Sequence, residues 1–365
     1  MKKIAIDARE LRTSSGRYIE RLLHYLQQID NGHEYVVLLK PEDFDGWQPT
    51  NKHFKKVTAP FKEFTFAEQI GFSRQVKSLN ADLVHFAFVQ QPVYLRSKVV
   101  TTMHDLTTTK FRNPSKNRLV FTAKQQVYKQ VNKLVARKSA FVITPSEYVK
   151  DAVAKFAHIN SRKIFVTYES ADKITDEPVK IEQLTDKDSY IMYVGRPLPH
   201  KNLENLIAAF TMLKTTHPDL KLVLAGKKDT LYKRISRDVD NAGITDVIFT
   251  DFVSEGQLRW LYEHTAAYVF PSLSEGFGLP GLEAMIHGAP VVSSNATCLP
   301  EIYGDAAEYF NPLEPFEIAS AVARVIDDSK HASKLRQLGR LQAAKYSWKR
   351  TAEQTLDVYK QVLGE

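Results

Sequence analysis

The chain of 365 residues is longer than most single domains and predicts two, and its 43% hydrophobic and 25% charged residues are those of an ordinary globular protein. Fifty Lys and Arg against 42 Asp and Glu give a net charge of +8, which suits an anionic small ligand, an anionic membrane surface or a nucleic acid without choosing among them. No window reaches about 18 apolar residues, the start MKKIAIDAR lacks a signal-peptide core, and Cys298 is the single cysteine. We therefore expect a cytoplasmic protein without a disulfide, with Cys298 a small buried residue and not a nucleophile.

Strand and helix patterns alternate through the first half. We predict strands at residues 3–8, 35–39, 57–59, 82–86, 98–103, 141–144 and 164–166, and helices at residues 19–29, 66–79, 114–138 and 148–156. Gly16 follows the first strand and is either only a turn residue or a point where the backbone approaches a phosphate or a substrate. His104 and Asp105 follow the strand at residues 98–103 directly, so we expect them at its carboxyl end.

The predicted helix at residues 114–138 is basic and amphipathic. Its charged residues are Lys124, Lys129, Lys133, Arg137 and Lys138, and its apolar residues include Val127, Tyr128, Val131, Leu134 and Val135. Such helices usually bury the apolar face and solvate the charged one, and docking on an anionic membrane is the alternative. Nucleic acid is not expected as a partner, because no recognised nucleic-acid motif accompanies the helix.

A second series of strands and helices follows a polar, acid-rich segment. We predict strands at residues 190–194, 220–225, 247–250, 266–270, 290–293 and 306–310, and helices at residues 203–213, 231–241 and 254–265, with two more helical segments from residue 315 to the end. The polar segment, residues 171–189, is predicted to link a domain of residues 1–170 to one of residues 190–348. Such series predict an α/β fold with two facing, doubly wound Rossmann-like domains whose cleft is the natural binding site.

The stretch at residues 270–301, FPSLSEGFGLPGLEAMIHGAPVVSSNATCLPE, carries the densest chemical signal. An apolar strand ends at its start, which places Glu275 at a strand's carboxyl end, where open α/β sheets bind ligands. Three glycines follow, at positions 276, 278 and 281, and they permit a positive φ or a close approach to a ligand.

A helix is predicted to start within this stretch, at a turn suited to an anion. Pro280 fits the first helical turn, and the free N–H groups of residues 277–282 favour a phosphate. Glu283 is predicted on that first turn, in position to accept hydrogen bonds from sugar hydroxyls. A glycine-rich loop with two solvated acids is the alternative, and the agreement of strand, turn, acids and helix disfavours it.

Several stretches together resemble the retaining glycosyltransferases of family 4, such as bacterial and archaeal mannosyl- and glucosyltransferases, which have the GT-B architecture of two Rossmann-like domains. The similarity is strongest over residues 190–312, where the motifs are YVGRPLPHKN, DFVSEGQLRWLYEHTAAYVFPSLSEGFGLPGLEAM, GAPVVSSN and LPEIYGDAAEYFNP. The first half matches more loosely, through IDAREL, SGRY and TTMHDL. The ending YSWKRTAEQTLDVYKQVL resembles the family's last helix and implies that residues 349–365 pack back on the N-terminal domain.

The resemblance implies a site for a nucleotide diphosphate sugar, GDP-mannose or a UDP-sugar. Arg196 and Lys201 would bind the diphosphate, whose charge a guanidinium and an ammonium neutralise. Glu283 would hold the ribose, and Glu275 would contact hydroxyls of the transferred sugar.

The resemblance also implies roles for other residues. The sugar and phosphate would meet the backbone amides of Phe277, Gly278 and Leu279. Val253 and Leu258 would line the base pocket. His104 would contact the transferred sugar near the reacting carbon, and Asp105 would orient His104 or the acceptor. Two positions depart from the family pattern: Asp251 stands where glycine is usual, and His287 replaces a small residue.

The implied reaction moves a hexose to a hydroxyl of a glycan or lipid-linked acceptor, with retention, in the synthesis of a cell-surface polysaccharide or glycolipid. No Asp-x-Asp pair stands at a suitable strand end and no His or Cys cluster has ligand spacing, so we expect neither a required metal nor a cofactor. Membrane docking would place the protein at the inner face of the cell membrane. The alternatives are a synthase of a small soluble glycoside, a hydrolase with Glu275 and Glu283 as its two carboxylates, and a non-enzymatic protein that binds anionic surfaces.

Overall fold

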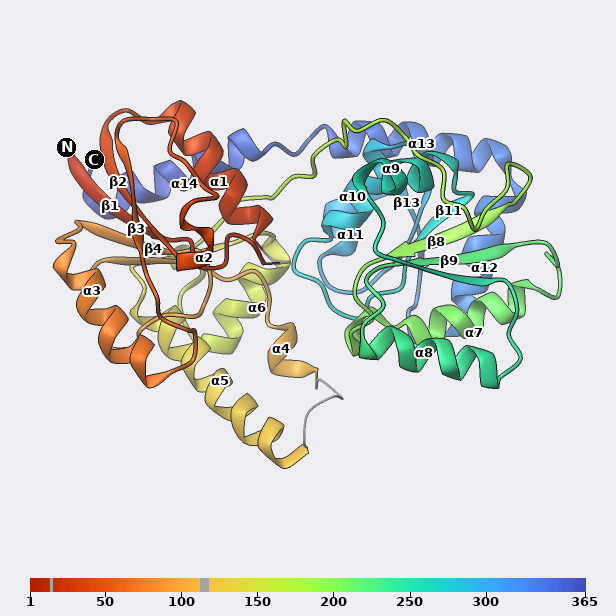
Figure 1. Ribbon diagram of the computed structural model, residues 1–365, viewed down its shortest axis with the longest axis horizontal. Coiled ribbons are helices and arrows are strands. Elements are labelled where there is room, and N and C mark those ends of the chain that lie inside the picture. The colour runs from red at the N-terminus through yellow and green to blue at the C-terminus, as the bar shows by residue number, and fades with distance from the viewer. Residues whose placement is uncertain (14–15, 112–117) are drawn as a thin grey trace. The chain divides into compact units, whose positions relative to one another are not determined.

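The computed structural model describes residues 1–13, 16–111 and 118–365 and divides the chain into two compact units. Unit 1 comprises Met1–Thr109, Thr122–Glu169 and Ser347–Glu365, and unit 2 comprises Lys110–Phe121 and Ser170–Tyr346. Apart from the short stretch Lys110–Phe121, the chain enters unit 2 after Glu169 and returns to unit 1 at Ser347 (Figure 1).

Unit 1 is built on a seven-stranded parallel sheet with the order β3-β2-β1-β4-β5-β6-β7. Its strands are β1 (Lys2–Asp7), β2 (His33–Leu39), β3 (Phe54–Thr58), β4 (Leu83–Phe86), β5 (Val99–Thr102), β6 (Phe141–Thr144) and β7 (Ile164–Val166). Its helices are α1 (Arg17–Ile29), α2 (Pro41–Phe44), a π-helix (Glu68–Phe72), α3 (Ser73–Ser78), α4 (Thr107–Lys110), α5 (Arg118–Lys138), α6 (Glu147–Ala157), a 3₁₀ turn (Ser161–Lys163) and α14 (Trp348–Leu363). The strand order reverses direction between β1 and β4, which is the position where doubly wound sheets bind ligands.

The last helix of the chain, α14, is held in the core of unit 1 by a buried polar chain. The Tyr359 hydroxyl meets His85 Nδ1 on β4, and His85 Nε2 lies 2.9 Å from Thr102 Oγ1 on β5. The same Thr102 oxygen lies 2.9 Å from the Tyr18 hydroxyl of α1, against which α14 packs. All four side chains are buried, so their polar atoms have lost their hydrogen bonds to water. The hydrogen bonds of this chain offset that desolvation cost, which apolar neighbours are unable to do.

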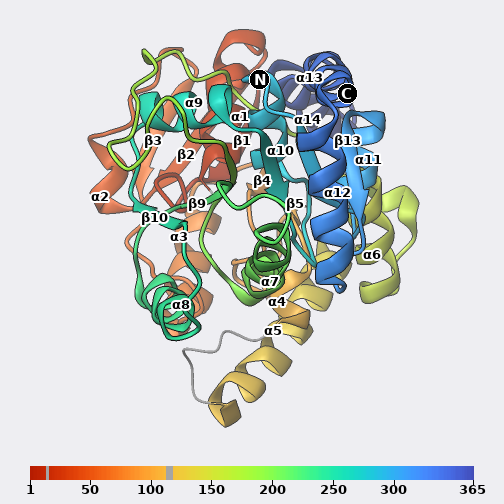
Figure 2. The ribbon, with the colours of Figure 1, turned by 90° about the vertical axis from the view of Figure 1, so that its right-hand side faces the viewer.

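Unit 2 is built on a six-stranded parallel sheet with the order β10-β9-β8-β11-β12-β13. Figure 2 labels β9 and β10, which end the sheet on one side, and β13, which ends it on the other. Its strands are β8 (Tyr190–Val194), β9 (Lys221–Ala225), β10 (Val247–Asp251), β11 (Ala267–Phe270), β12 (Val291–Ser294) and β13 (Ala307–Phe310). Its helices are a 3₁₀ turn (Pro199–Lys201), α7 (Leu203–Leu213), α8 (Thr230–Asn241), α9 (Glu255–His264), α10 (Leu279–Ile286), α11 (Leu299–Tyr303), a 3₁₀ turn (Gly304–Ala306), α12 (Pro315–Asp327) and α13 (Ser329–Ala343). Strands β8 and β11 read as continuous apolar runs because both faces of a parallel sheet are covered.

The predicted α/β fold with two parallel-sheet, Rossmann-like domains is confirmed, and three local predictions were wrong. The third strand begins earlier than the predicted residues 57–59, at Phe54. The single helix predicted at residues 66–79 is a π-helix that continues into α3. Three helices and not two follow residue 315, because Asp328 caps α13 directly after α12 ends. Within the described ranges, no helix combines the length and apolar character needed to cross a bilayer.

The buried chain that anchors α14 can be tested with Tyr359→Phe. The change leaves His85 Nδ1 buried and without its partner, so we expect unit 1 to lose about 1–3 kcal/mol of unfolding free energy. Guanidinium unfolding followed by circular dichroism measures the loss. Tyr94→Phe, which removes a hydroxyl from an 86% exposed side chain, is the matched control. Equal stability of the two variants would show that the Tyr359 hydroxyl contributes nothing.

Candidate functional site

Unusual backbone conformations gather at the carboxyl edge of the unit 2 sheet. Residues with positive φ lie after β8, before α7, after β9, at the end of β10, before α10 and after β12: Gly195 (138°), Asn202 (59°), Gly226 (156°), Asp251 (62°), Gly278 (99°) and Thr297 (57°). Backbone conformations of this kind cluster at ligand sites, because surrounding structure must hold them. This edge is therefore a candidate ligand site on its geometry alone.

An ion pair joins two of the loops at this edge. Lys201 Nζ lies 2.6 Å from Glu275 Oε1, and both side chains are mostly buried, with 18% and 12% exposed. The Glu275 backbone N–H donates to Thr297 Oγ1 at 3.1 Å, which ties in the loop after β12. Lys201 and Glu275, placed apart by sequence analysis, are thus direct partners.

Asn202, which sequence analysis did not single out, also connects loops at this edge. Its side-chain amide donates to the carbonyl of Pro271 at 3.1 Å and to the carbonyl of Pro312 at 2.7 Å. These two prolines follow β11 and β13, so one side chain fixes three loops. Its left-handed backbone, with φ of 59°, is a conformation that Asn tolerates better than most residues.

Arg196 lies at the same edge in a more exposed position. Its Nε donates to Asp229 Oδ2 at 2.7 Å, and 59% of the side chain is exposed. Asp229 also caps α8 by accepting from the N–H groups of Leu231 and Tyr232. Burial raises the pKa of Asp229, but Arg196 and the two amides outweigh it and leave that pKa below its ordinary value. Asp229 was missed, although an Asp directly before a helical run is a recognised capping signal.

The glycine turn before α10 serves packing as well as conformation. Gly278 has the expected positive φ, and α10 begins at Leu279 with Pro280 in its first turn, as predicted. A Cβ on Gly278 or Gly281 would lie 2.5 or 2.2 Å from the Tyr303 hydroxyl, which donates to the Gly278 carbonyl at 2.6 Å. The Gly281 position is therefore explained by Tyr303 and does not require a ligand.

Glu283 lies deeper than predicted. It is the fifth residue of α10, in the second turn and not the first, and it is buried. Tyr262 donates to its Oε2 at 3.4 Å, and Tyr262 also stacks on the ring of His287 at 5.9 Å. His287 caps the end of α10, and its Nε2 accepts from the Ile174 N–H at 3.1 Å, so the unusual histidine has a structural partner.

Phe277 and Leu279 flank Gly278 differently. The Phe277 side chain is buried against Tyr346, with ring centroids 5.5 Å apart, so only its backbone is available to a ligand. Leu279 is half-buried at the start of α10. Cys298 is fully buried and burial raises the pKa of its thiol, which fits the predicted structural role.

The predicted base-pocket residues follow β10. Val253 and Leu258 are half-buried near the start of α9, whose capping box between Ser254 and Gln257 is present as expected. Asp251 has a φ of 62°, which explains why glycine is usual here, and its carboxylate accepts from the Lys228 N–H at 2.7 Å.

In unit 1, His104 lies beyond the carboxyl end of β5. Its Nδ1 is 2.9 Å from Glu169 Oε1, and its Nε2 is 3.0 Å from the Ala87 carbonyl. The rings of Tyr18 and Phe88 pack on it at 4.7 and 4.9 Å. Glu169 was missed, because it lies 65 residues away along the chain and no local pattern marks it.

Asp105 and Gly16 have local roles. Asp105 Oδ1 accepts from the Thr107 N–H at 2.6 Å and so turns the chain into α4. Gly16 has an ordinary helical φ of −71°, and a Cβ there would lie 2.0 Å from the Leu11 carbonyl oxygen. The glycine is thus required by the loop's own backbone, which favours the turn reading over close approach to a phosphate.

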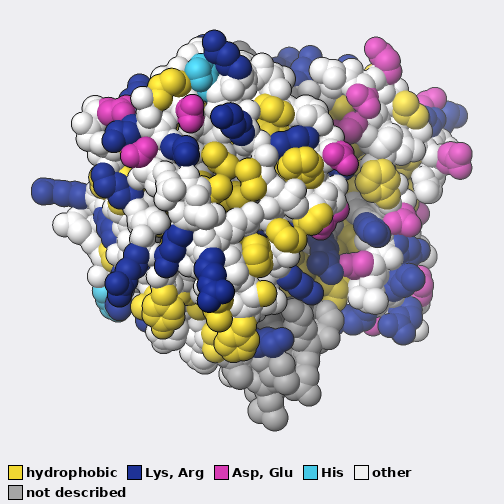
Figure 3. Space-filling view, turned by 60° about the vertical axis from the view of Figure 1, so that its left-hand side comes forward, with side chains coloured by type: hydrophobic (Ala, Val, Ile, Leu, Met, Phe, Trp, Pro, Cys, Tyr) yellow, Lys and Arg dark blue, Asp and Glu magenta, His cyan; other side chains and the backbone are white. Residues whose placement is uncertain are grey.

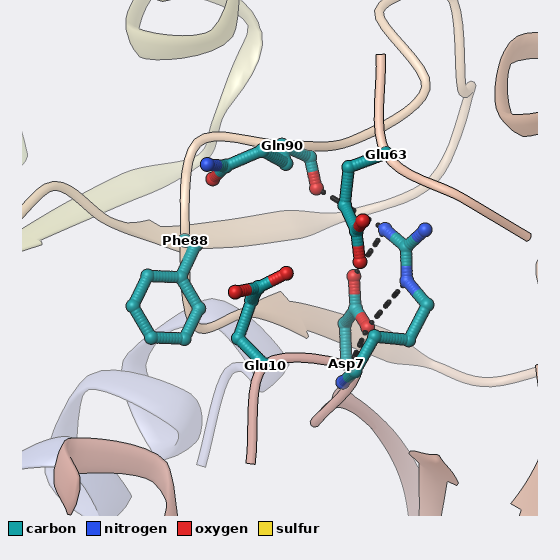
Figure 4. A pocket seen from close by; sticks show the side chains of 6 residues that line it. Asp7, Glu10, Glu63, Phe88 and Gln90 are labelled. Carbon is teal, nitrogen blue, oxygen red and sulfur yellow. Dashed lines mark hydrogen bonds and ion pairs between the residues drawn. The ribbon is translucent and has the colours of Figure 1, made fainter. Parts of the chain in front are cut away.

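A small hollow, with room for about one water molecule, lies at the carboxyl ends of β1 and β4 (Figure 4); it is lined by Asp7, Arg9, Glu10, Glu63, Phe88 and Gln90. Lys40 bridges Glu10 at 3.3 Å and Glu63 at 2.9 Å. Burial and a hydrogen bond with Glu63 raise the pKa of Glu10. Three of the six lining residues are acids, so this small hollow suits a water or a single hydroxyl group and disfavours phosphate.

Two family descriptions match the chain: Glycosyltransferase Family 4 over residues 15–172 and Glycosyl transferases group 1 over residues 175–342. The chain belongs to glycosyltransferase family 4. Over its whole length the chain also has the fold of a sucrose-phosphate synthase from Thermosynechococcus elongatus, with a TM-score of 0.80, 19% identity and 100% of both chains covered. The GT-B fold follows from these matches.

Curated relatives of the chain include two from Escherichia coli. O-antigen chain mannosyltransferase B is 29% identical over 60% of this chain and 60% of its own length. The serotype-specific mannosyltransferase WbdA is 35% identical over 50% of this chain and 24% of its own length. The matched region thus spans less than two thirds of each relative.

The predicted role of Lys201 in binding the diphosphate can be tested with Lys201→Met. Loss of a charge-assisted contact should weaken binding of GDP or UDP about 10- to 100-fold, measured by calorimetry. Lys214→Met is the matched control, because Lys214 pairs with Asp246 at 2.8 Å before the start of β10, away from the carboxyl edge. Equal weakening by both variants would contradict the assignment.

Proposed function

We propose that the chain transfers a hexose from GDP-mannose or a UDP-sugar to a hydroxyl of a glycan or lipid-linked acceptor, with retention of the anomeric configuration. The observation that carries the proposal is the carboxyl edge of unit 2, where Lys201 pairs with Glu275 in the loop that leads to α10 and Arg196 pairs with Asp229 at the start of α8. Two cations and a helix N-terminus suit a diphosphate, and a partly buried carboxylate suits sugar hydroxyls.

The charges at this edge match those of the reaction. As the bond from the sugar C1 to the diphosphate breaks, negative charge grows on the leaving phosphate, and Arg196, Lys201 and the amides before α10 stabilise it. The acceptor oxygen bonds to C1 on the same face, and its proton passes to the leaving phosphate oxygen. The products are a nucleoside diphosphate and a glycoside, with no covalent enzyme intermediate.

A mannosyl donor is the favoured choice. Several curated relatives are named as mannosyltransferases, and two of these names refer to an O-antigen chain. We extend this chemistry to the present chain: mannose as the transferred sugar and a cell-surface polysaccharide or its lipid-linked precursor as the product. Synthesis of a small soluble glycoside is the second candidate, supported by the shared fold with sucrose-phosphate synthase.

A paired-carboxylate hydrolase is disfavoured by the surroundings of the two acids. Glu275 is held by Lys201, and Glu283 is buried beneath Tyr262. Two acids that flank a reacting bond need access to it from opposite sides.

The proposal is tested by offering GDP-mannose and UDP-hexoses to the purified protein in the presence of EDTA. One donor at 100 times its Kd should raise the unfolding free energy by about 2.7 kcal/mol, seen as a thermal shift. With that donor and mannose-terminated acceptors, proton NMR should show an α-anomeric product, with undiminished rate in EDTA. An inverted product, a metal requirement, or release of free sugar as fast as transfer would each contradict a stated part of the proposal.

We also propose that unit 1 docks on an anionic membrane through an apolar surface next to α5. This surface consists of Phe64 (58% exposed), Phe66 (88%), Ile70 (55%), Tyr94 (86%) and Val127 (65%). Its parts are adjacent, because Phe64 packs on Tyr128 of α5 at 5.8 Å and the Val93 N–H donates to Gln69 at 2.8 Å. Figure 3 shows basic side chains interspersed with apolar ones on unit 1. Aromatic groups flanked by lysines are typical of interfacial binding.

The helix itself contributes less charge than expected. Lys138 is turned inward, where it donates to the Pro92 carbonyl at 2.5 Å, and burial lowers its pKa to about 8. Arg137 donates to the Ala157 carbonyl at 2.8 Å. Among the apolar residues, Val135 is buried, whereas Val127 and Leu134 are exposed. The docking surface is therefore centred on residues 64–70 more than on the helix.

Docking is tested by flotation with phosphatidylglycerol vesicles and with phosphatidylcholine vesicles. Phe66→Ser should reduce binding to the anionic vesicles about 10-fold or more, because an inserted phenyl ring is worth roughly 1.5–3 kcal/mol. Phe316→Ser, at a 71% exposed position of unit 2, is the matched control. Binding that ignores lipid charge, or that survives in Phe66→Ser, would contradict the proposal.

A further inference from the structure

Glu169 lies where the chain leaves unit 1, and its side chain turns back into that unit. It is 6% exposed, with Oε1 2.9 Å from His104 Nδ1. The residue before it, Tyr168, accepts a hydrogen bond at its carbonyl from the Thr351 hydroxyl in the first turn of α14. The segment that leaves unit 1 is thus held in that unit as far as Glu169. The next residue, Ser170, belongs to unit 2.

The two partners of His104 determine where its protons lie. The Ala87 carbonyl, 3.0 Å from Nε2, can only accept, so Nε2 carries a hydrogen. Nδ1 faces a carboxyl oxygen at 2.9 Å, a contact that requires a second proton between the two atoms. An imidazole is ordinarily more basic than a carboxylate, so this proton belongs on the ring. Both ring nitrogens are then donors, and His104 is an imidazolium.

We propose that Glu169 is a positioning residue that holds His104 as a doubly hydrogen-bonded imidazolium during sugar transfer. An imidazolium has no lone pair, so His104 is unable to take the acceptor's proton as a base. Instead it presents a fixed positive charge and an oriented ring. The catalytic consequence of this inference rests on the proposed function. Because His104 is unable to act as the base, the departing phosphate is the group that takes the proton from the acceptor hydroxyl.

The other groups around the ring are consistent with a single positive charge. Burial lowers the pKa of His104, but the hydrogen bond and charge of Glu169, with smaller help from Ala87 and Asp105, raise it above its ordinary value. His85, on β4, stays neutral, because burial and the charge of His104 lower its pKa to about 3. Tyr18 and Phe88 contribute ring faces and edges and no charge at neutral pH.

The test measures the protonation of His104 directly, in protein labelled with ¹⁵N-histidine. The chain has 11 histidines, and His104→Gln identifies the signal. In the wild type at pH 7 both ring nitrogens should show the shift of a protonated imidazolium. In Glu169→Gln the titration midpoint should fall by about 1–3 units, because the opposite charge within hydrogen-bonding distance is gone. Glu169→Asp should restore part of the shift. An unprotonated Nδ1 in the wild type, or an unmoved midpoint in Glu169→Gln, would overturn the inference.

Activity supplies the second measurement. The alkaline limb of kcat against pH should move to lower pH in Glu169→Gln and return partly in Glu169→Asp, with the donor KM changed less than threefold. Glu147→Gln, at an exposed glutamate of α6, is the matched control. A uniform loss of kcat at every pH would show a merely structural role and contradict the proposal. If no donor supports transfer, the proposed function fails, while the NMR measurement still decides the state of His104.

Discussion

The ion pair between Lys201 and Glu275 is the interaction on which the candidate site in unit 2 depends. It joins the loops after β8 and β11, which are neighbouring strands, and through the Glu275 backbone it reaches the loop after β12. Each charge is mostly buried, and either one alone would carry an uncompensated desolvation cost. The pair therefore fixes the Lys201 ammonium group in one position at the carboxyl edge of the sheet. Since the pair has no net charge, the attraction for a diphosphate comes from its geometry together with Arg196 and the N-terminus of α10.

The fold was largely predictable, because strand and helix periodicity is a local property. The strands of both sheets were found, and so were Gly278, Pro280 and the capping box of α9. What could not be predicted depends on contacts between distant segments. The depth of Glu283 follows from where α10 begins, and Gly281 is required by Tyr303, which lies in another helix. The periodicity of apolar residues indicates neither the depth of Glu283 nor the requirement for Gly281.

The same limit applies to unit 1. Sequence analysis selected His104 by its place after a strand, and that placement holds, but its partner Glu169 has no local signature. Lys138 was counted with the solvated charges of a helix and is instead turned into the protein, since a helical pattern cannot say which face a neighbouring loop will cover. The hollow at β1 and β4 was missed for a similar reason: Glu10, Lys40 and Glu63 come from three separate loops.

The place of α14 has a consequence for synthesis of the protein. The core of unit 1 contains Tyr359, which is translated only after all of unit 2. Until α14 has been translated, His85 Nδ1 lacks its partner Tyr359, and the surface of α1 against which α14 packs is uncovered. Unit 2, whose segments are nearly continuous, can complete its core first, although it begins later. Unit 1 therefore completes its fold last. A nascent chain that stalls before α14 has been translated contains a folded unit 2 and an incompletely folded unit 1.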